Sequence, residues 1–162
     1  MTKIGVISDT HIPIAAQKLP AEIFKIFKDV DMILHAGDLV DISVLRDLSK
    51  LAETHAVCGN MDPAELQRQL PEKEVVRVGK FSIGLIHGHG APFNLMNRIK
   101  GEFDQKVDAI VYGHSHSPVN EYRDGILFFN PGSPTDLIFA KYKSCGMLTI
   151  SNKIEGRIIK LK

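Results

Sequence analysis

Residues 3–11 read KIGVISDTH, a short apolar run that passes directly into Ser8, Asp9 and His11. A run of this kind is typical of a buried β-strand. Asp9 and His11 are two residues apart, so on an extended segment both side chains point to the same side. The stretch therefore predicts a buried strand that carries two candidate ligand side chains at its carboxyl end.

The same alternation continues through the first half of the chain. Residues 32–35 and 55–58 have the pattern of buried strands, and residues 20–27, 41–51 and 63–70 have helical apolar stripes. Asp41 stands where a helix N-cap is expected. Strands that alternate with helices predict βαβ units and a parallel sheet.

The second half of the chain is richer in strand patterns. They fall at residues 74–78, 81–87, 109–112, 119–123, 126–130, 147–151 and 154–160, with one helical pattern at 93–103. The dipeptides Gly79-Lys80, Asp124-Gly125 and Asn152-Lys153 predict hairpin turns. No Pro-, Gly- or Ser-rich linker interrupts the chain. We therefore expect a single domain, residues 1–162, with a mixed α/β core.

Composition and charge exclude several classes of protein. The 162 residues carry a formal net charge of +1, which gives no electrostatic case for binding nucleic acid or a membrane surface. The longest apolar run is four residues, whereas a membrane-spanning helix needs about 20. Cys58 and Cys145 lie far apart without a CxxC spacing, so we expect reduced core cysteines. With no signal-peptide pattern in residues 1–8, a cytoplasmic protein is expected; a homo-oligomer is left open.

Polar residues gather where the predicted strands end. Five strands each end in a glycine or a tight loop beside a carboxylate, an amide or an imidazole. In α/β sheets, ligands bind outside the carboxyl ends of the strands, so these side chains should converge in space. The candidates are Asp9, His11, Asp38, Asn60, His87, His114 and His116.

Seven ligands of this kind predict two metal ions rather than one. Asp, His and Asn together suit Mn²⁺, Zn²⁺, Fe or Ni²⁺. Seven donors are too many for one ion and fit two ions that share a carboxylate. Gly37, Gly59, Gly88 and Gly113 fit the turns that bring the backbone close to the ions.

Each residue taken alone also has a structural explanation. Asp38 or Asp62 alone would be read as a turn former, and His55 as an ordinary structural histidine. His35 fits a supporting role behind the ligands, and the role of His89 stays undecided. A structural explanation of the whole set would require five separate strand ends to carry such side chains by accident. A common binding site explains the set more simply.

The set resembles the calcineurin-like metallophosphoesterase family. The resemblance rests on Asp9-x-His11, Gly37-Asp38, Gly59-Asn60, His87-Gly88-His89 and Gly113-His114-x-His116, in family order. The start GVISDTH and the segment Asn130-Pro131-Gly132-Ser133 look like the small prokaryotic phosphodiesterase branch. The resemblance implies a four-layer αββα sandwich, in which two β-sheets pack face to face and are flanked by helices.

The resemblance also implies a dinuclear phosphodiesterase. Asp9, His11, Asp38 and His116 would hold one divalent ion, Asp38, Asn60, His87 and His114 the other, and Asp38 would bridge them. A hydroxide held by both ions would attack a small-molecule phosphodiester. Mn²⁺ is the first expectation for the metal, with Zn²⁺, Fe or Ni²⁺ as alternatives. Asn60, as a neutral ligand, keeps the site positive and so favours an anionic substrate.

One position departs from the family pattern. Many relatives have a histidine after the Gly-Asn pair, taken as the general acid and oriented by the next aspartate; here Met61 stands in that place, before Asp62. His89 and a metal-bound water are therefore the candidate proton donors. The alternatives are a scaffold like the small retromer subunit, which lacks part of the metal set, a nuclease, or a phosphomonoesterase.

Overall fold

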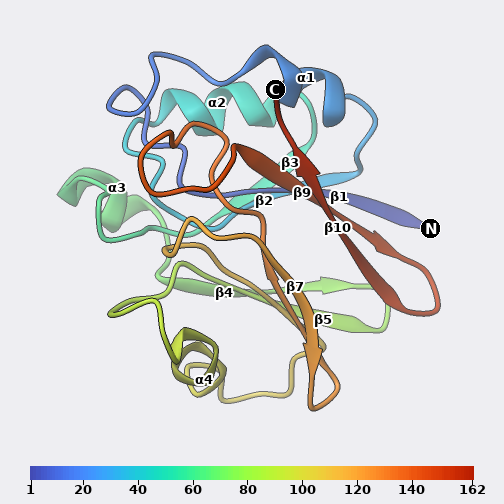
Figure 1. Ribbon diagram of the computed structural model, residues 1–162. Coiled ribbons are helices and arrows are strands. Elements are labelled where there is room, and N and C mark those ends of the chain that lie inside the picture. The colour runs from blue at the N-terminus through green and yellow to red at the C-terminus, as the bar shows by residue number, and fades with distance from the viewer.

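Two five-stranded sheets form the centre of the computed structural model, which describes residues 1–162. The strands of the first sheet, in the order β10-β9-β1-β2-β3, are Ile154–Lys160, Ser144–Ile150, Thr2–Ile7, Met32–His35 and Glu53–Ala56. The strands of the second, in the order β4-β5-β6-β8-β7, are Lys73–Val78, Phe81–Ile86, Ala109–Val111, Ile126–Asn130 and Val119–Arg123. Both sheets are mixed, because parallel βαβ pairs are extended by antiparallel strands (Figure 1).

The two sheets pack face to face through one apolar layer. Val6 of β1 belongs to this layer with Leu85 of β5 and Phe129 of β8, and all three are fully buried. Because side chains alternate along a strand, Ile7 faces the other way, into a second cluster beneath the helices. β1 is therefore buried on both faces, which explains its nearly continuous apolar sequence.

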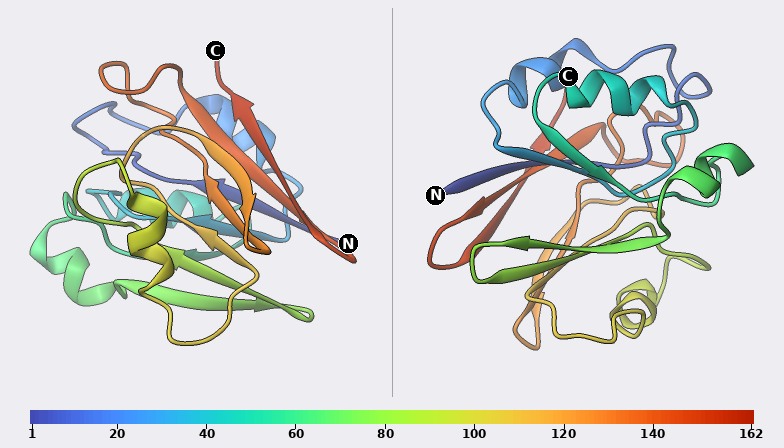
Figure 2. Two further views of the ribbon diagram at one scale, coloured as in Figure 1. Left: turned by 60° about the horizontal axis from the view of Figure 1, so that its bottom comes forward. Right: turned by 180° about the vertical axis from the view of Figure 1, so that it is seen from behind.

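Short helices cover the outer faces of both sheets. The helices are α1 (Ala21–Ile26), α2 (Ser43–Ser49), α3 (Ala64–Gln69) and α4 (Leu95–Lys100). α1 and α2 lie over the first sheet and α4 over the second, while α3 lies apart at one edge (Figure 2). The layers thus follow one another as α, β, β, α, and the predicted sandwich fold is confirmed.

Several predicted boundaries were wrong. The helix expected over residues 93–103 is only Leu95–Lys100, because Asn94 adopts a left-handed backbone with φ of 57°. β3 begins two residues earlier than predicted, so Cys58 lies in the loop beyond it rather than in the strand. The helix expected from Asp41 begins at Ser43, whose backbone N–H is bound by the Asp41 carboxylate at 2.8 Å.

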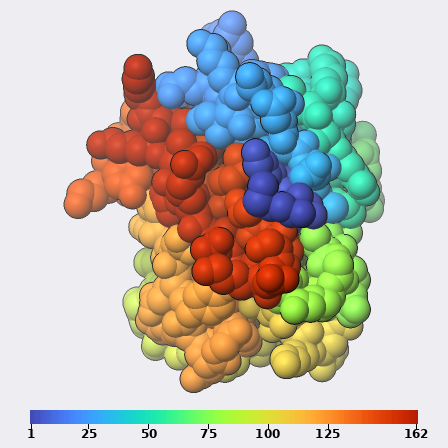
Figure 3. All heavy atoms as spheres, turned by 90° about the vertical axis from the view of Figure 1, so that its right-hand side faces the viewer, coloured from blue at the N-terminus to red at the C-terminus, as the bar shows by residue number.

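Parallel pairing brings the important strand ends to one edge of the molecule. Ile7 of β1 is level with His35 of β2, and Leu85 of β5 is level with Val111 of β6. The loops that follow these strands lie on the left of Figure 1. At the opposite end, shown in Figure 3, the N-terminal residues lie against the red C-terminal strands. None of the helices has the length and apolar character needed to cross a bilayer.

Candidate metal centre

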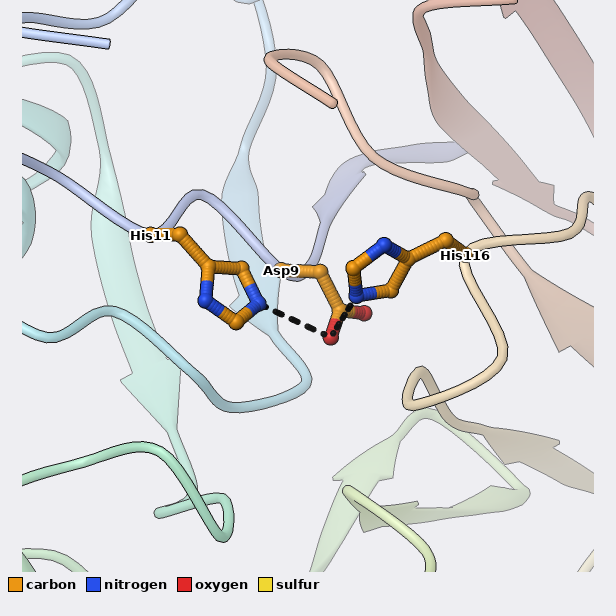
Figure 4. A group of neighbouring side chains, drawn as sticks. All are labelled: Asp9, His11 and His116. Carbon is orange, nitrogen blue, oxygen red and sulfur yellow. Dashed lines mark ion pairs between the residues drawn. The ribbon is translucent and has the colours of Figure 1, made fainter. Parts of the chain in front are cut away.

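Asp9 is the point on which the first group of ligands converges. It stands two residues after the end of β1 at Ile7 and is fully buried. Its Oδ1 lies 3.6 Å from Nε2 of His11 and 3.2 Å from Nε2 of His116. Figure 4 shows both rings directed at this one oxygen from opposite sides. The two side chains do lie together, but the extended segment expected from their spacing was wrong, because Asp9 and His11 both have a positive φ beyond the end of β1.

Asp38 and His87 extend this group towards the second sheet. Oδ2 of Asp38 lies 3.1 Å from Nε2 of His87 and 3.4 Å from Nε2 of His11. Nε2 of His87 is also 3.8 Å from Oδ1 of Asp9. Asp9 therefore belongs to two candidate metal sites, one with His11 and His116 and one with Asp38 and His87. The Asp38 carboxylate lies between His11 and His87, where a bridging ligand would stand.

Asn60 and His114 complete the set beside His87. Oδ1 of Asn60 is 3.1 Å from Nε2 of His87, and the His114 and His87 ring centroids are 5.3 Å apart. All seven residues singled out in the sequence therefore lie around one centre, although they are spread over residues 9–116.

Three of the imidazoles are fixed by hydrogen bonds from one ring nitrogen to the surrounding protein. Nδ1 of His87 donates to the Ala36 carbonyl at 2.7 Å, and Nε2 of His114 donates to the Gly90 carbonyl at 2.7 Å. Nδ1 of His116 pairs with the Asp136 carboxylate at 2.5 Å. Such bonds set which nitrogen is left for a metal. The sequence analysis missed Asp136, because it stands 20 residues after His116 in a segment without a motif.

The electrostatics of the centre fit metal ions. Burial by itself raises the pKa of Asp9, but the imidazoles of His11 and His116 hold it well below its usual range. Burial lowers the pKa of His87, yet Asp38 and Asp9 raise it to about 9. Oδ1 of Asp9 and Nε2 of His11 are buried without hydrogen-bond partners. Buried polar atoms are rarely left without a partner, and a divalent cation would bind both of these.

The backbone is strained at the candidate ligands themselves. Five of the seven candidate ligand residues have a positive φ, which residues other than glycine seldom adopt. These are Asp9 (54°), His11 (44°), Asp38 (58°), His114 (71°) and His116 (58°). Strain of this kind clusters at functional sites, where the rest of the fold maintains it.

Asp62 supports the loop that carries Asp38. Its carboxylate accepts hydrogen bonds from the backbone N–H groups of Asp38 (3.0 Å), Val40 (2.7 Å) and Gly59 (2.7 Å). A side chain on Gly59 would collide with the Asp38 carboxylate, so the close approach of the two loops requires glycine here. The resemblance suggested that Asp62 would be free to orient a side chain at position 61. That expectation is corrected, because the carboxylate is buried and bound to the backbone.

The remaining histidines have separate surroundings. His89, a predicted catalytic residue, is 61% exposed and lies 3.5 Å from Glu102; both line a cavity of about 340 Å³ that also reaches Asn60 and His87. His55 pairs with Glu53 and Glu74 outside the centre. His35 is fully buried, with its pKa lowered to about 3 by burial, and it accepts the Gly37 N–H.

The strand ends of this αββα sandwich bring together carboxylates, imidazoles and an amide. This arrangement is that of a metal-binding α/β protein. The family model of the calcineurin-like phosphoesterase superfamily domain matches residues 2–153, and the chain belongs to this family. A probable metallophosphoesterase of Methanocaldococcus jannaschii is 39% identical over 98% of this chain and 81% of its own length.

Solved structures agree with this assignment. An archaeal phosphodiesterase covers 99% of this chain and 100% of its own, with 28% identity and a TM-score of 0.76. The zinc complex of wild-type Vps29 from Entamoeba histolytica covers 98% of this chain and 99% of its own, with 24% identity and a TM-score of 0.76. The likeness to Vps29 shows a shared fold.

Proposed function

We propose that this chain is a metal-dependent phosphodiesterase with a dinuclear centre. The observation that carries the proposal is the grouping of His11, His116, Asp38 and His87 around the buried Asp9, with Asn60 and His114 beside His87, together with the unpartnered atoms there. Asp9, His11, Asp38 and His116 would hold one ion, and Asp38, Asn60, His87 and His114 the other. Asp9 lies close enough to both groups to stabilise either ion.

The chemistry proposed is attack of water on phosphorus, with formation of one P–O bond and cleavage of the ester P–O bond. A pair of divalent cations, when bound, supplies positive charge for the phosphoryl oxygens and lowers the pKa of the attacking water. Mn²⁺ is the proposed metal, and Zn²⁺, Fe and Ni²⁺ suit the same donors.

The protein's own groups orient the ligands and handle the leaving group. The Ala36, Gly90 and Asp136 contacts hold three imidazoles in fixed orientations. Asn60 adds no negative charge, so the centre stays attractive to an anionic phosphodiester. His89 and a water molecule are the two candidate proton donors, and His89 lines the cavity that reaches Asn60.

A second candidate function is that of a protein-interaction scaffold, since Vps29 proteins share the fold. The complete donor set favours the enzyme. A scaffold has no need for five ligand positions with strained backbone around unpartnered buried polar atoms. A phosphomonoesterase would use the same centre. It differs from a phosphodiesterase in which substrate, monoester or diester, is hydrolysed faster.

The test is a metal-dependence assay on bis(4-nitrophenyl) phosphate and 4-nitrophenyl phosphate. The purified protein is stripped with EDTA and then titrated with Mn²⁺, Zn²⁺ or Ni²⁺. We expect no turnover in EDTA, recovery with a divalent metal, and a higher rate on the diester. Full diesterase activity in the stripped protein would contradict the metal centre, and a preference for the monoester would assign a phosphomonoesterase.

A further inference from the structure

A segment of three exposed apolar residues stands next to the metal centre. Leu137, Ile138 and Phe139 are 78%, 83% and 78% exposed, whereas large apolar side chains are usually buried. They belong to the loop between β8 and β9, drawn in orange-red on the left of Figure 1. We call Leu137, Ile138 and Phe139 the apolar loop. Adjacent exposed side chains of this kind commonly mark a binding surface.

The apolar loop is held in a fixed position. The Asp136 carboxylate accepts the backbone N–H groups of Ile138 (2.7 Å), Phe139 (3.1 Å) and Ala140 (3.0 Å). Just before it, Thr135 Oγ1 donates to the Thr10 carbonyl at 2.8 Å. The Asp136 bonds thus fold the loop locally, and the Thr135 bond attaches its N-terminal side to the segment that follows β1.

The same contacts place the apolar loop at the ligand His116. The carboxylate that holds the loop also pairs with Nδ1 of His116, and the Phe139 and His116 ring centroids are 6.4 Å apart. A group bound at the centre is therefore close enough to extend over Phe139.

The opposite side of the centre is polar. The cavity that reaches Asn60 and His87 is lined mainly by polar and charged residues, among them Gln67, Lys73 and Glu102. A diester whose phosphate sits at the centre therefore meets two different surfaces, one for each of its ester arms.

We infer that the apolar loop binds an apolar ester arm of the substrate, so that the substrate class is a phosphodiester with one alkyl or aryl arm. This inference rests on the proposed phosphodiesterase function. Burial of methylene groups against the loop provides the preference, since apolar surface removed from water stabilises the bound state roughly in proportion to its area.

The first test varies the arm and keeps the leaving group constant. The substrates are methyl, butyl and octyl esters of 4-nitrophenyl phosphate, used below their micelle concentrations with Mn²⁺-loaded protein. Because a loop covers only one side of the chain, we expect kcat/KM to rise about tenfold from methyl to butyl. Equal kcat/KM for all three esters would overturn the inference and leave the phosphodiesterase intact. No hydrolysis of any ester with metal present would overturn the proposed function and this inference with it.

The second test removes the apolar surface. Phe139→Ser and Ile138→Ser should reduce the butyl-to-methyl ratio of kcat/KM to below threefold. Phe93→Ser is the matched control, because Phe93 is 73% exposed on another loop and should leave the ratio unchanged. An equal loss of the ratio in Phe93→Ser would contradict a specific role for the apolar loop.

A binding measurement avoids turnover altogether. Calorimetry with methylphosphonate and butylphosphonate, whose C–P bonds do not hydrolyse, should give about tenfold tighter binding of the butyl compound, and this difference should disappear in Phe139→Ser. Size-exclusion chromatography tests a second copy as the occupant. A wild-type dimer that Phe139→Ser converts to a monomer would assign the loop to self-association and overturn the inference.

Discussion

The Asp136 carboxylate lies 2.5 Å from Nδ1 of His116, and Nε2 of the same ring lies 3.2 Å from Oδ1 of Asp9. One imidazole thus connects a supporting carboxylate to the buried carboxylate at the centre. Carboxylates placed behind metal-binding histidines fix the ring orientation and raise the basicity of the ligand nitrogen.

The first prediction is that Asp136→Asn weakens metal binding without unfolding the protein. Supporting residues of this kind typically contribute about 10–100-fold to metal affinity or activity. Isothermal titration with Mn²⁺ measures the affinity, and ¹⁵N NMR of His116 reports which nitrogen is protonated. Glu74→Gln is the matched control, since Glu74 pairs with His55 at 2.8 Å outside the centre. Unchanged affinity and tautomer in Asp136→Asn would show that the contact has no orienting role.

The second prediction concerns the bridging position of Asp38. Asp38→Asn removes a charge between His11 and His87, so we expect a fall in turnover of about 100-fold or more, with loss of bound metal. Metal content is measured by elemental analysis alongside the diesterase rate. His55→Ala should keep both the metal and the rate. If His55→Ala were as damaging as Asp38→Asn while still folded, the assignment of the ligand set would fail.

The third prediction is a pair of opposite pH trends. In the metal-free protein the pKa values of His87 and His116 are raised from 6.5 to about 9. For both rings burial lowers the pKa, and the neighbouring carboxylates outweigh it. A raised folded-state pKa contributes stability that is complete below pH 6.5 and is lost as the pH rises to about 9. The melting temperature in EDTA should therefore fall across this range.

Metal affinity should move in the other direction over the same pH range. A metal must displace the protons on His87 and His116, so binding strengthens as the pH rises. Calorimetric melting in EDTA and Mn²⁺ titration at pH 6.5, 7.5 and 8.5 measure both trends. A metal-free melting temperature that rises with pH would be inconsistent with protonated imidazoles at the centre.

The fourth prediction concerns the leaving group. Met61 offers no proton donor beside Asn60, so wild type should hydrolyse nitrophenyl esters well and dialkyl esters poorly. General acid catalysis typically contributes about 10²–10⁴-fold. Met61→His should raise the alkyl rate relative to the aryl rate, but by less than this, because the Asp62 carboxylate is bound to three backbone N–H groups.

His89 is the competing donor in that experiment. If His89 supplies the proton, the wild-type rate depends little on the leaving-group pKa, and His89→Ala makes the dependence steeper. Rates for a series of leaving groups in wild type, Met61→His and His89→Ala distinguish the two cases. A flat dependence in both wild type and His89→Ala would contradict each of them and leave a water molecule as the donor.

The sequence identified residues that the fold brings together because strand ends are marked locally. An apolar run followed by Asp9 or His87 identifies both the strand and the residue that leaves its carboxyl end, and parallel pairing then brings such ends together. Cys58 and Cys145 were also predicted correctly as buried, unpaired cysteines.

What the sequence could not provide are contacts between distant loops. Asp136 reaches His116, and Asp62 reaches Val40, through loop conformations that no periodic pattern encodes. The length of α4 depended in the same way on the left-handed Asn94, which apolar spacing does not reveal.

The left-handed backbone at the candidate ligands bears on which substitutions are expected at these positions in related sequences. A left-handed conformation costs an L-residue about 1–2 kcal/mol relative to its usual conformation, and glycine avoids that cost. A descendant that no longer needed metal would gain stability by replacing His114 or His116 with glycine, and purifying selection would no longer oppose the change. Glycines at these positions in a related sequence would thus mark a chain that no longer binds metal through them.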